Sequence, residues 1–426
     1  MTDSEDVALT RRRALEALRN GVPNPAAVEI LGCRQPAAEA AFTERLARAA
    51  EGDGRSGGVP GVLFSGNFGS GKSHLLTHLE RLALSRGFVC SRVAVSKETP
   101  LYDLGKVFKS AVENARMPGR QGRMIEELAS AMDWKSEPSA GFFQWTDGEA
   151  RAGRLSLLFP ATLLVYERLG NPETNRRIES FWAGDRIRAA DVNEGLRQIG
   201  QKKNYSFRAP RAADLPPQRL RFATALIRAA GYRGWVILLD EIELVGYYSL
   251  LQRGRSYAEL ARWLAPAAGD VCPGLVAAGT VIDAFYLDVV SPDGKQDCDY
   301  VRPRMEASRH ADLALRAEAG MRLLHDQRCI PLEDPTDQDV RGTVEKLRRI
   351  YSEAYGWDAP AVTVTGSRAG TQDRMRYWVR AAIIEWDLMR IYPGVRPETV
   401  DGGFRHTFKE NTDLERASQD DPPDAG

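Results

Sequence analysis

Eight consecutive residues have the composition of a loop that binds the phosphates of a nucleoside triphosphate. The loop occupies residues 66–73 and reads Gly-Asn-Phe-Gly-Ser-Gly-Lys-Ser, between an apolar run at 62–64 and an amphipathic stretch at 74–79. Glycines let the backbone curl so that successive N–H groups point at the phosphates, and the following helix adds the positive end of its dipole. We expect Lys72 to reach the β- and γ-phosphates and the Ser73 hydroxyl to bind Mg²⁺. The predicted nucleotide-binding residues are Gly66, Asn67, Phe68, Gly69, Ser70, Gly71, Lys72, Ser73 and His74.

Two acids at the end of a second apolar run could supply the metal residue and the catalytic base that the phosphate loop lacks. The run at 235–239 has the composition of a buried strand, and Asp240 and Glu241 follow it directly. An acid at a strand end beside the phosphate loop can hold Mg²⁺ through its waters, and a second acid can polarise the attacking water. We therefore predict Asp240 as the metal residue and Glu241 as the catalytic base. The alternative is a strand-to-loop transition that happens to be acidic, and Glu243 is a reserve candidate for which a helix cap or a surface position is expected.

One threonine and several arginines are candidates for contacts with the γ-phosphate. Thr280 follows the apolar run at 275–278, where its hydroxyl could touch the phosphate or orient the water, as at the sensor position of an AAA+ ATPase. A turn residue or helix cap is the alternative role of Thr280. Arginines later in the chain could stabilise the charge of the transition state. Arg302 and Arg304 are predicted finger residues that act in a neighbouring subunit, and Arg376 is predicted to reach back in cis.

Arg374 and Arg380, on the same late helix, are alternatives to Arg376 for this role in cis. Arg253 and Arg255 rank below all of these. For each arginine the alternative is a solvated surface charge.

The composition excludes a global electrostatic attraction to nucleic acid or to an anionic membrane. Lys+Arg and Asp+Glu both number 58, so the formal net charge is zero. The five cysteines are scattered without a CxxC pair, which favours thiols in a reducing compartment. The first residues are acidic where a signal peptide would be basic, and no apolar run approaches the length of a membrane span. We expect a cytoplasmic protein without membrane contact.

The apolar patterns predict an α/β fold, with a parallel sheet flanked by helices in the manner of a P-loop NTPase. Besides the runs already described, a strand is predicted at 88–95 and a helix from residue 102 to about 115. The remaining predicted helices cover 9–20, 36–50, 217–230, 344–355 and 374–391.

Four consecutive segments are predicted from these elements. Residues 1–57 form an N-terminal helical segment, and residues 58–330 form an AAA+-like ATPase core with a mostly helical insertion at about 117–214. A helical lid follows at 331–412, and a disordered tail at 413–426.

Five stretches of the chain resemble the ATP-binding proteins of BREX-type phage-defence systems, the relatives usually called BrxD. Residues 14–24 look like the N-terminal signature of that family, and the loop at 66–74 with residues 93–101 looks like its nucleotide core. Residues 230–243 are similar to its acidic strand, and residues 379–388 to its closing helix. The resemblance runs from about residue 9 to 395, loosely in the insertion.

The resemblance implies an AAA+ ATPase, related to origin-recognition-like proteins, that acts beside a DNA methyltransferase and other defence components. It also implies ATP as the nucleotide, since no guanine-selective element is visible. The chain departs from origin-recognition proteins in one respect: the residues after the last predicted helix are fewer than a winged-helix DNA-binding domain requires.

Three functions remain open from the sequence. The first is an ATP-hydrolysing component that remodels or regulates a DNA-bound defence complex, alone or as a homo-oligomer. The second is a nucleotide-switched scaffold with little turnover. The third is direct DNA binding through the basic stretches at 11–13 and 202–211, where aromatic residues lie among the charges.

Overall fold

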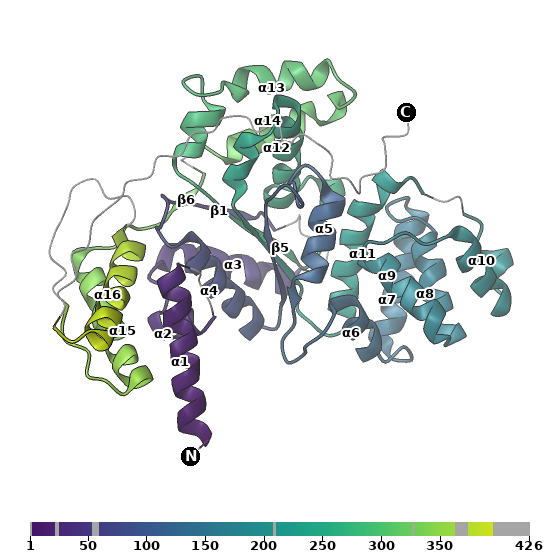
Figure 1. Ribbon diagram of the computed structural model, residues 1–426. Helices are drawn as coiled ribbons and strands as arrows, with labels where there is room; N and C mark the ends of the chain where they lie inside the picture. Colours follow the sequence, from purple (N-terminus) through teal and green to yellow (C-terminus); the bar gives the residue numbers. More distant parts are fainter. Residues whose placement is uncertain are drawn as a thin grey trace.

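A six-stranded sheet forms the centre of the protein in a computed structural model (Figure 1). The structure describes residues 2–21, 25–52, 59–207, 210–325, 328–362 and 374–394, and the side chains of these residues except 2–6 and 374. The strand order is β3-β2-β4-β5-β1-β6. The strand bounds are β1 Val62–Ser65, β2 Val89–Ala94, β3 Ala115–Arg116, β4 Trp235–Asp240, β5 Leu275–Val281 and β6 Ile330–Pro331.

The sheet is mostly parallel, as predicted, but its edge strand β3 is antiparallel to β2. Helix α5 (Leu104–Glu113) ends before the predicted residue 115, and the chain returns at once beside β2, so that it pairs in the reverse direction. The predicted strand at 275–278 is also longer than expected. Gly279 and Thr280 remain in register with Leu63 and Phe64 of β1, so Thr280 lies inside β5 and not after it.

Alternate residues of the strands face two different layers of helices. Val236 and Leu238 of β4 pack with α3 (Pro36–Glu51) and α4 (Lys72–Ser85) on one face. Trp235, Ile237 and Leu239 face the opposite layer, which contains α5, α11 (Leu215–Ala229) and α12 (Leu250–Leu264). Helices cover both faces of the sheet, which explains why the residues of β4 before Asp240 form a continuous apolar run.

The segment predicted as a mostly helical insertion contains a bundle of helices beside α11 (Figure 1). Its buried aromatic residues include Phe159 and Trp182, which both contact Phe222 of α11, so the bundle shares one hydrophobic core with the sheet. The helix bounds are α6 Met124–Ala131, α7 Glu137–Arg151, α8 Leu158–Leu169, α9 Pro172–Ala183 and α10 Ala189–Gln198.

A second group of helices lies beyond the carboxyl side of β4 and β5, at the top of Figure 1. Helix α12 packs closely on α14 (Ala314–Leu323), where a Cβ on Gly320 would lie 1.9 Å from the Tyr257 carbonyl oxygen. Helix α13 (Asp297–Glu306) packs on both. The short helices are Lys202–Asn204, Ala212–Asp214, η3 Ile242–Tyr247, Ala268–Asp270, Tyr286–Val290 and Ala311–Leu313.

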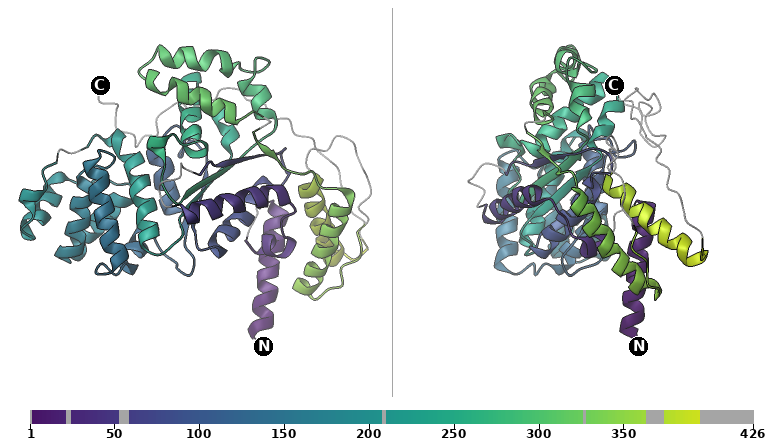
Figure 2. Two further views of the ribbon diagram at one scale, coloured as in Figure 1. Left: turned by 180° about the vertical axis from the view of Figure 1, so that it is seen from behind. Right: turned by 90° about the vertical axis from the view of Figure 1, so that its left-hand side faces the viewer.

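The first helix of the chain packs with the last two in a separate hydrophobic cluster. This terminal cluster joins α1 (Thr2–Asn20) to α15 (Asp337–Tyr355) and α16 (Arg374–Ile391), with α2 (Pro25–Leu31) alongside (Figure 2). The predicted segments 1–57 and 331–412 thus contact each other, while α3 packs on the sheet. The predicted tail at 413–426 lies outside the described residues.

Candidate functional site

The phosphate-loop sequence lies between β1 and α4, at the carboxyl end of the sheet. Gly69 and Gly71 have φ of 77° and 97°, in the left-handed region that favours glycine. A Cβ on Gly66 would lie 2.5 Å from Ser70 Oγ, so a larger residue would not fit there without a shift. Helix α4 begins at Lys72 without a side-chain cap, which leaves its first N–H groups available to an anion.

Lys72 bends back over the loop in this structure. Its Nζ donates to the Gly66 and Asn67 carbonyl oxygens at 2.8 and 3.1 Å, and it lies 5.1 Å from the centre of the Phe68 ring. The ammonium group thus lies over the loop, where the phosphates of a nucleotide are expected.

His74 turns away from the loop, although the sequence groups it with the nucleotide-binding residues. Its Nε2 lies 2.7 Å from the Gly32 carbonyl oxygen at the end of α2, and burial lowers the pKa of the imidazole. The side chain of His74 therefore connects α4 to the segment between α2 and α3.

Asp240 is the point at which three strands and α4 meet. Its Oδ1 accepts hydrogen bonds from the Thr280 hydroxyl at 2.8 Å and from the Glu241 backbone N–H at 3.0 Å. Its Oδ2 accepts from the Ser73 hydroxyl at 3.2 Å and from Arg92 at 2.5 Å. The structure therefore brings together three of the residues predicted for the site: Ser73, Asp240 and Thr280.

The oxygen atoms of Ser73 and Asp240 fit a magnesium ion. Mg²⁺ prefers hard oxygen ligands and keeps several waters, so in nucleotide sites one or two protein oxygens and the phosphates are sufficient. Within the described residues there is no group of three or more His, Cys, Asp or Glu side chains that could hold a metal by themselves. The pair is thus suited to a metal that arrives with a nucleotide.

Arg92 is a site residue that the sequence reading missed. It lies on β2, and besides Asp240 its guanidinium donates to the Thr77 hydroxyl of α4 at 3.2 Å. The signal was present in the sequence, because Arg92 is the one charged residue of β2 and lies on the face that packs against α4. The contact of Arg92 with Asp240 could not be predicted from the sequence, because the pairing of β2 with β4 joins residues far apart in the chain.

Glu241 has an uncommon backbone conformation for its residue type. Its φ and ψ are 60° and 37°, in the left-handed region, and its side chain is exposed. Partial burial of the carboxyl group raises its pKa, and the charge of Asp240 adds to this effect. Such strain at a strand end is characteristic of functional sites.

Glu243 is buried, so the expected surface position or helix cap was wrong. It belongs to η3, is 5% exposed, and its Oε2 has no hydrogen-bond partner. Burial raises the pKa of Glu243 to about 7, against the opposing charge of Lys72. The turn after Glu241 directs this side chain inward, which the sequence alone does not reveal.

Two of the three arginines predicted to contact the γ-phosphate make contacts within the chain. Arg302 pairs with Glu306 and Glu318 on α13 and α14, and Arg376 donates to the Gly21 carbonyl oxygen at 3.3 Å. Arg304 is an exposed residue of α13.

The other candidate arginines differ among themselves. Arg253 is buried in a double hydrogen bond to Asp297 at 2.8 Å, and Arg255 lies over the Tyr102 ring. Arg380 is exposed on α16, and the side chain of Arg374 lies outside the described ones.

The basic stretches considered for DNA binding also make contacts within the chain. Arg11 pairs with Glu353 at 2.7 Å, and Arg12 donates to the Ala354 carbonyl oxygen at 2.7 Å. Lys202 donates to the Tyr205 carbonyl oxygen, and Arg211 pairs with Asp214. Tyr205 and Phe207 pack against the core, and Arg208 lies outside the described residues.

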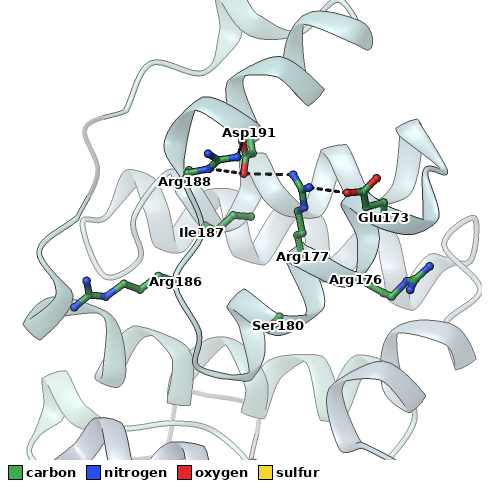
Figure 3. Close-up of a pocket in the computed structure, with 8 residues that line it drawn as sticks. All are labelled: Glu173, Arg176, Arg177, Ser180, Arg186, Ile187, Arg188 and Asp191. Atoms are coloured by element: carbon green, nitrogen blue, oxygen red, sulfur yellow. Dashed lines mark hydrogen bonds and ion pairs between the residues drawn. The ribbon is translucent and has the colours of Figure 1, made fainter. Parts of the chain in front are cut away.

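A surface pocket of about 440 Å³ lies in the helical bundle, on α9 and the segment before α10 (Figure 3). Arg177 lies between Glu173 and Asp191 and pairs with both, and Arg188 pairs with Asp191 as well. Arg176 and Arg186 point toward opposite sides of the view. The guanidinium groups do not converge on one point, so the pocket is not a formed anion site.

The sheet and the loop at the carboxyl end of β1 are compatible with the P-loop NTPase class of proteins. Residues 8–124, which include this loop, match the family model described as BREX system ATP-binding protein BrxC/D. The chain is therefore BrxC/D-like over this segment, and the family name implies a BREX-system component that binds ATP.

No curated protein and no solved structure was found to match the chain. Among the described residues, no helix is long and apolar enough to cross a membrane.

Proposed function

We propose that this chain binds ATP with Mg²⁺ at residues 66–73 and hydrolyses it as an AAA+ component of a BREX-type defence system. Hydrolysis would remodel or regulate a DNA-bound complex of defence proteins, with a methyltransferase or associated components as partners, in the cytoplasm. The observation that carries the proposal is the Asp240 carboxylate, which joins Ser73 of the loop to Thr280 of the neighbouring strand.

The backbone N–H groups of the loop and the start of α4 would hold the phosphates, and Lys72 would move from the Gly66 and Asn67 carbonyls onto them. Ser73 and Asp240 would hold Mg²⁺, which neutralises the charge that develops on the phosphates. Glu241 would accept a proton from the attacking water, and its raised pKa brings it nearer to the range of a general base. Thr280 lies on β5 between β1 and β4, which supports a sensor role for it.

Release of phosphate by the wild-type protein and by Glu241→Gln tests this proposal. We expect turnover in the wild type and a loss of about 100-fold or more in the variant, since a positioned base contributes about 10²–10⁴. Glu113→Gln, at an exposed position of α5, is the matched control and should leave the rate unchanged. Lys72→Ala should lose binding of a fluorescent ATP analogue. Tight binding with equally negligible release by wild type and Glu241→Gln, with and without DNA and partner proteins, would overturn the hydrolysis proposal.

The second candidate function is a nucleotide-switched scaffold, favoured by Arg376, which was predicted to reach the loop in cis but donates to the Gly21 carbonyl oxygen. Hydrolysis would be slow without an arginine beside the γ-phosphate. The mass of the protein measured by light scattering with and without ATP separates this function from the first. A change of oligomeric state or of partner capture, without turnover, would favour the scaffold, whereas an unchanged mass and unchanged capture would exclude it.

A further inference from the structure

Arg92 is a cation in direct contact with Asp240, to which it donates a hydrogen bond at 2.5 Å. The carboxylate side chain of Asp240 is 7% exposed, so it has little solvent to balance its charge. Arg92 reaches it from the neighbouring strand β2 and is fixed on its other side by Thr77. Both side chains lie on the sheet face that α4 covers.

The same oxygen of Asp240 serves Arg92 and the predicted metal position. Oδ2 accepts from Ser73, the residue predicted to bind Mg²⁺, and from Arg92 at 2.5 Å. A divalent ion held between Ser73 and Asp240 would face the guanidinium across one carboxylate, and like charges at such a distance repel. Arg92 and the metal therefore compete for Asp240.

We propose that Arg92 is a positioning residue that holds Asp240 in the metal-free site and must release it when Mg²⁺ enters with the nucleotide. This inference rests on the proposed nucleotide site. Arg92 thereby sets how strongly the metal contributes to nucleotide binding, and it keeps the buried carboxylate in place when no nucleotide is bound.

A second carboxylate is available to receive Arg92. Glu80 lies one turn beyond Thr77 on α4, is 6% exposed, and its pKa is raised by burial but lowered by the charges of Arg116 and Arg92. Arg116 of the edge strand β3 pairs with Glu80 at 3.3 Å. When Arg92 leaves Asp240, it moves toward Glu80, so entry of the metal is linked to the strand that leads into the helical bundle.

The affinity of a fluorescent ATP analogue, measured once with Mg²⁺ and once with EDTA, tests the proposal without any turnover. For Arg92→Gln we expect binding with Mg²⁺ to be about fivefold tighter or more, the lower end of usual coupling between sites, and binding with EDTA to be unchanged. Glu80→Gln should have the opposite effect with Mg²⁺, because it removes the alternative partner of Arg92. Asp240→Asn should bind equally with Mg²⁺ and with EDTA.

Arg92→Lys separates a role of charge from a role of shape. A lysine keeps a positive charge beside Asp240 but cannot donate to Thr77 at the same time. Because the proposal depends on the charge, we expect nearly wild-type affinities with Mg²⁺ and with EDTA. If Arg92→Gln binds the analogue with Mg²⁺ no more tightly than the wild type, or if Arg92→Lys behaves like Arg92→Gln, the proposal is wrong. If the wild type does not bind the analogue at all, the proposed function fails first, which is a different result.

Discussion

At the scale of single residues, Glu243 shows how the environment of the site changes a carboxyl group. It is nearly fully buried beside Lys72, with Asp240 and Glu241 as further charges and Tyr247 close to it. Burial raises the pKa to about 7 from 4.5, so near neutral pH the group is half protonated. Folding takes up a proton at this residue when the pH lies between these two values.

Replacement of Glu243 by glutamine should therefore stabilise the protein in a pH-dependent manner. Below about pH 4.5 the carboxyl is protonated in both the folded and the unfolded state, and the variant and wild type should unfold at similar temperatures. As the pH rises from about 4.5 to about 7 the wild type loses stability, because its unfolded state ionises at this residue while the folded state keeps the proton, and the variant has no such loss; above about pH 7 the loss levels off. The difference should reach about 3 kcal/mol above pH 8.

Melting temperatures of both proteins between pH 4 and 9 provide the measurement. Glu113→Gln, on the surface of α5, should follow the wild type at each pH. A constant difference between Glu243→Gln and wild type over this range would contradict the raised pKa.

At the scale of elements, the close approach of α10 to α8 depends on one residue without a side chain. A Cβ on Gly195 would lie 2.6 Å from Val165 Cγ1, whereas a Cβ on Gly148 of α7 would meet nothing within 4 Å. Both glycines lie within helices, so the gain in helix propensity on replacement by alanine is the same for each.

Gly195→Ala should therefore lower the stability of the bundle by about 1–3 kcal/mol, the usual cost of overpacking. Gly148→Ala should raise it by about 0.5–1 kcal/mol, because the unfolded chain loses freedom without a new contact. Hydrogen exchange of α8 and α10 should report the first change, and ATP-analogue affinity should be unchanged in both variants. Slower exchange in Gly195→Ala than in the wild type would show that the helices have room to separate.

Features that depend on residues close together in the chain could be predicted from the sequence, whereas features that depend on contacts between distant segments could not. Local patterns predicted β1, β4 and the helix after the loop, since apolar runs and glycines act within a few residues. The direction of β3 and the inclusion of Thr280 in β5 depend on pairing between distant strands. Likewise, the loop and Asp240 could be predicted as site residues, whereas the place of Arg92 depends on the register of β2 against β4.

At the scale of the whole molecule, α1 is a structural part of the cluster formed by the last described helices. Leu15 is 1% exposed within this terminal cluster, and Arg19 pairs with Asp387 of α16 at 3.2 Å. Val7 lies on the same helix but is 47% exposed. Substitutions at Leu15 and at Val7 therefore distinguish a loss of contact with the terminal cluster from a change in the formation of helix α1.

Leu15→Ala should destabilise the terminal cluster by about 2–5 kcal/mol, the range for loss of a buried leucine side chain. Val7→Ala should change its stability by less than about 0.5 kcal/mol. Limited proteolysis followed by mass spectrometry should show faster cleavage within α15 and α16 in the first variant. Unchanged protection of these helices in Leu15→Ala would mean that α15 and α16 hold together without α1.

The pairing of α1 with α15 and α16 also has a consequence for synthesis on the ribosome. Helix α1 is translated before the sheet, but its partners follow only after the sheet and the bundle are complete. The part of the apolar side of α1 that packs on α15 and α16, which includes Leu15, stays uncovered while the rest of the chain emerges. A chain whose translation stops before α15 would keep that side exposed, and quality-control proteases could recognise the unfinished product by it.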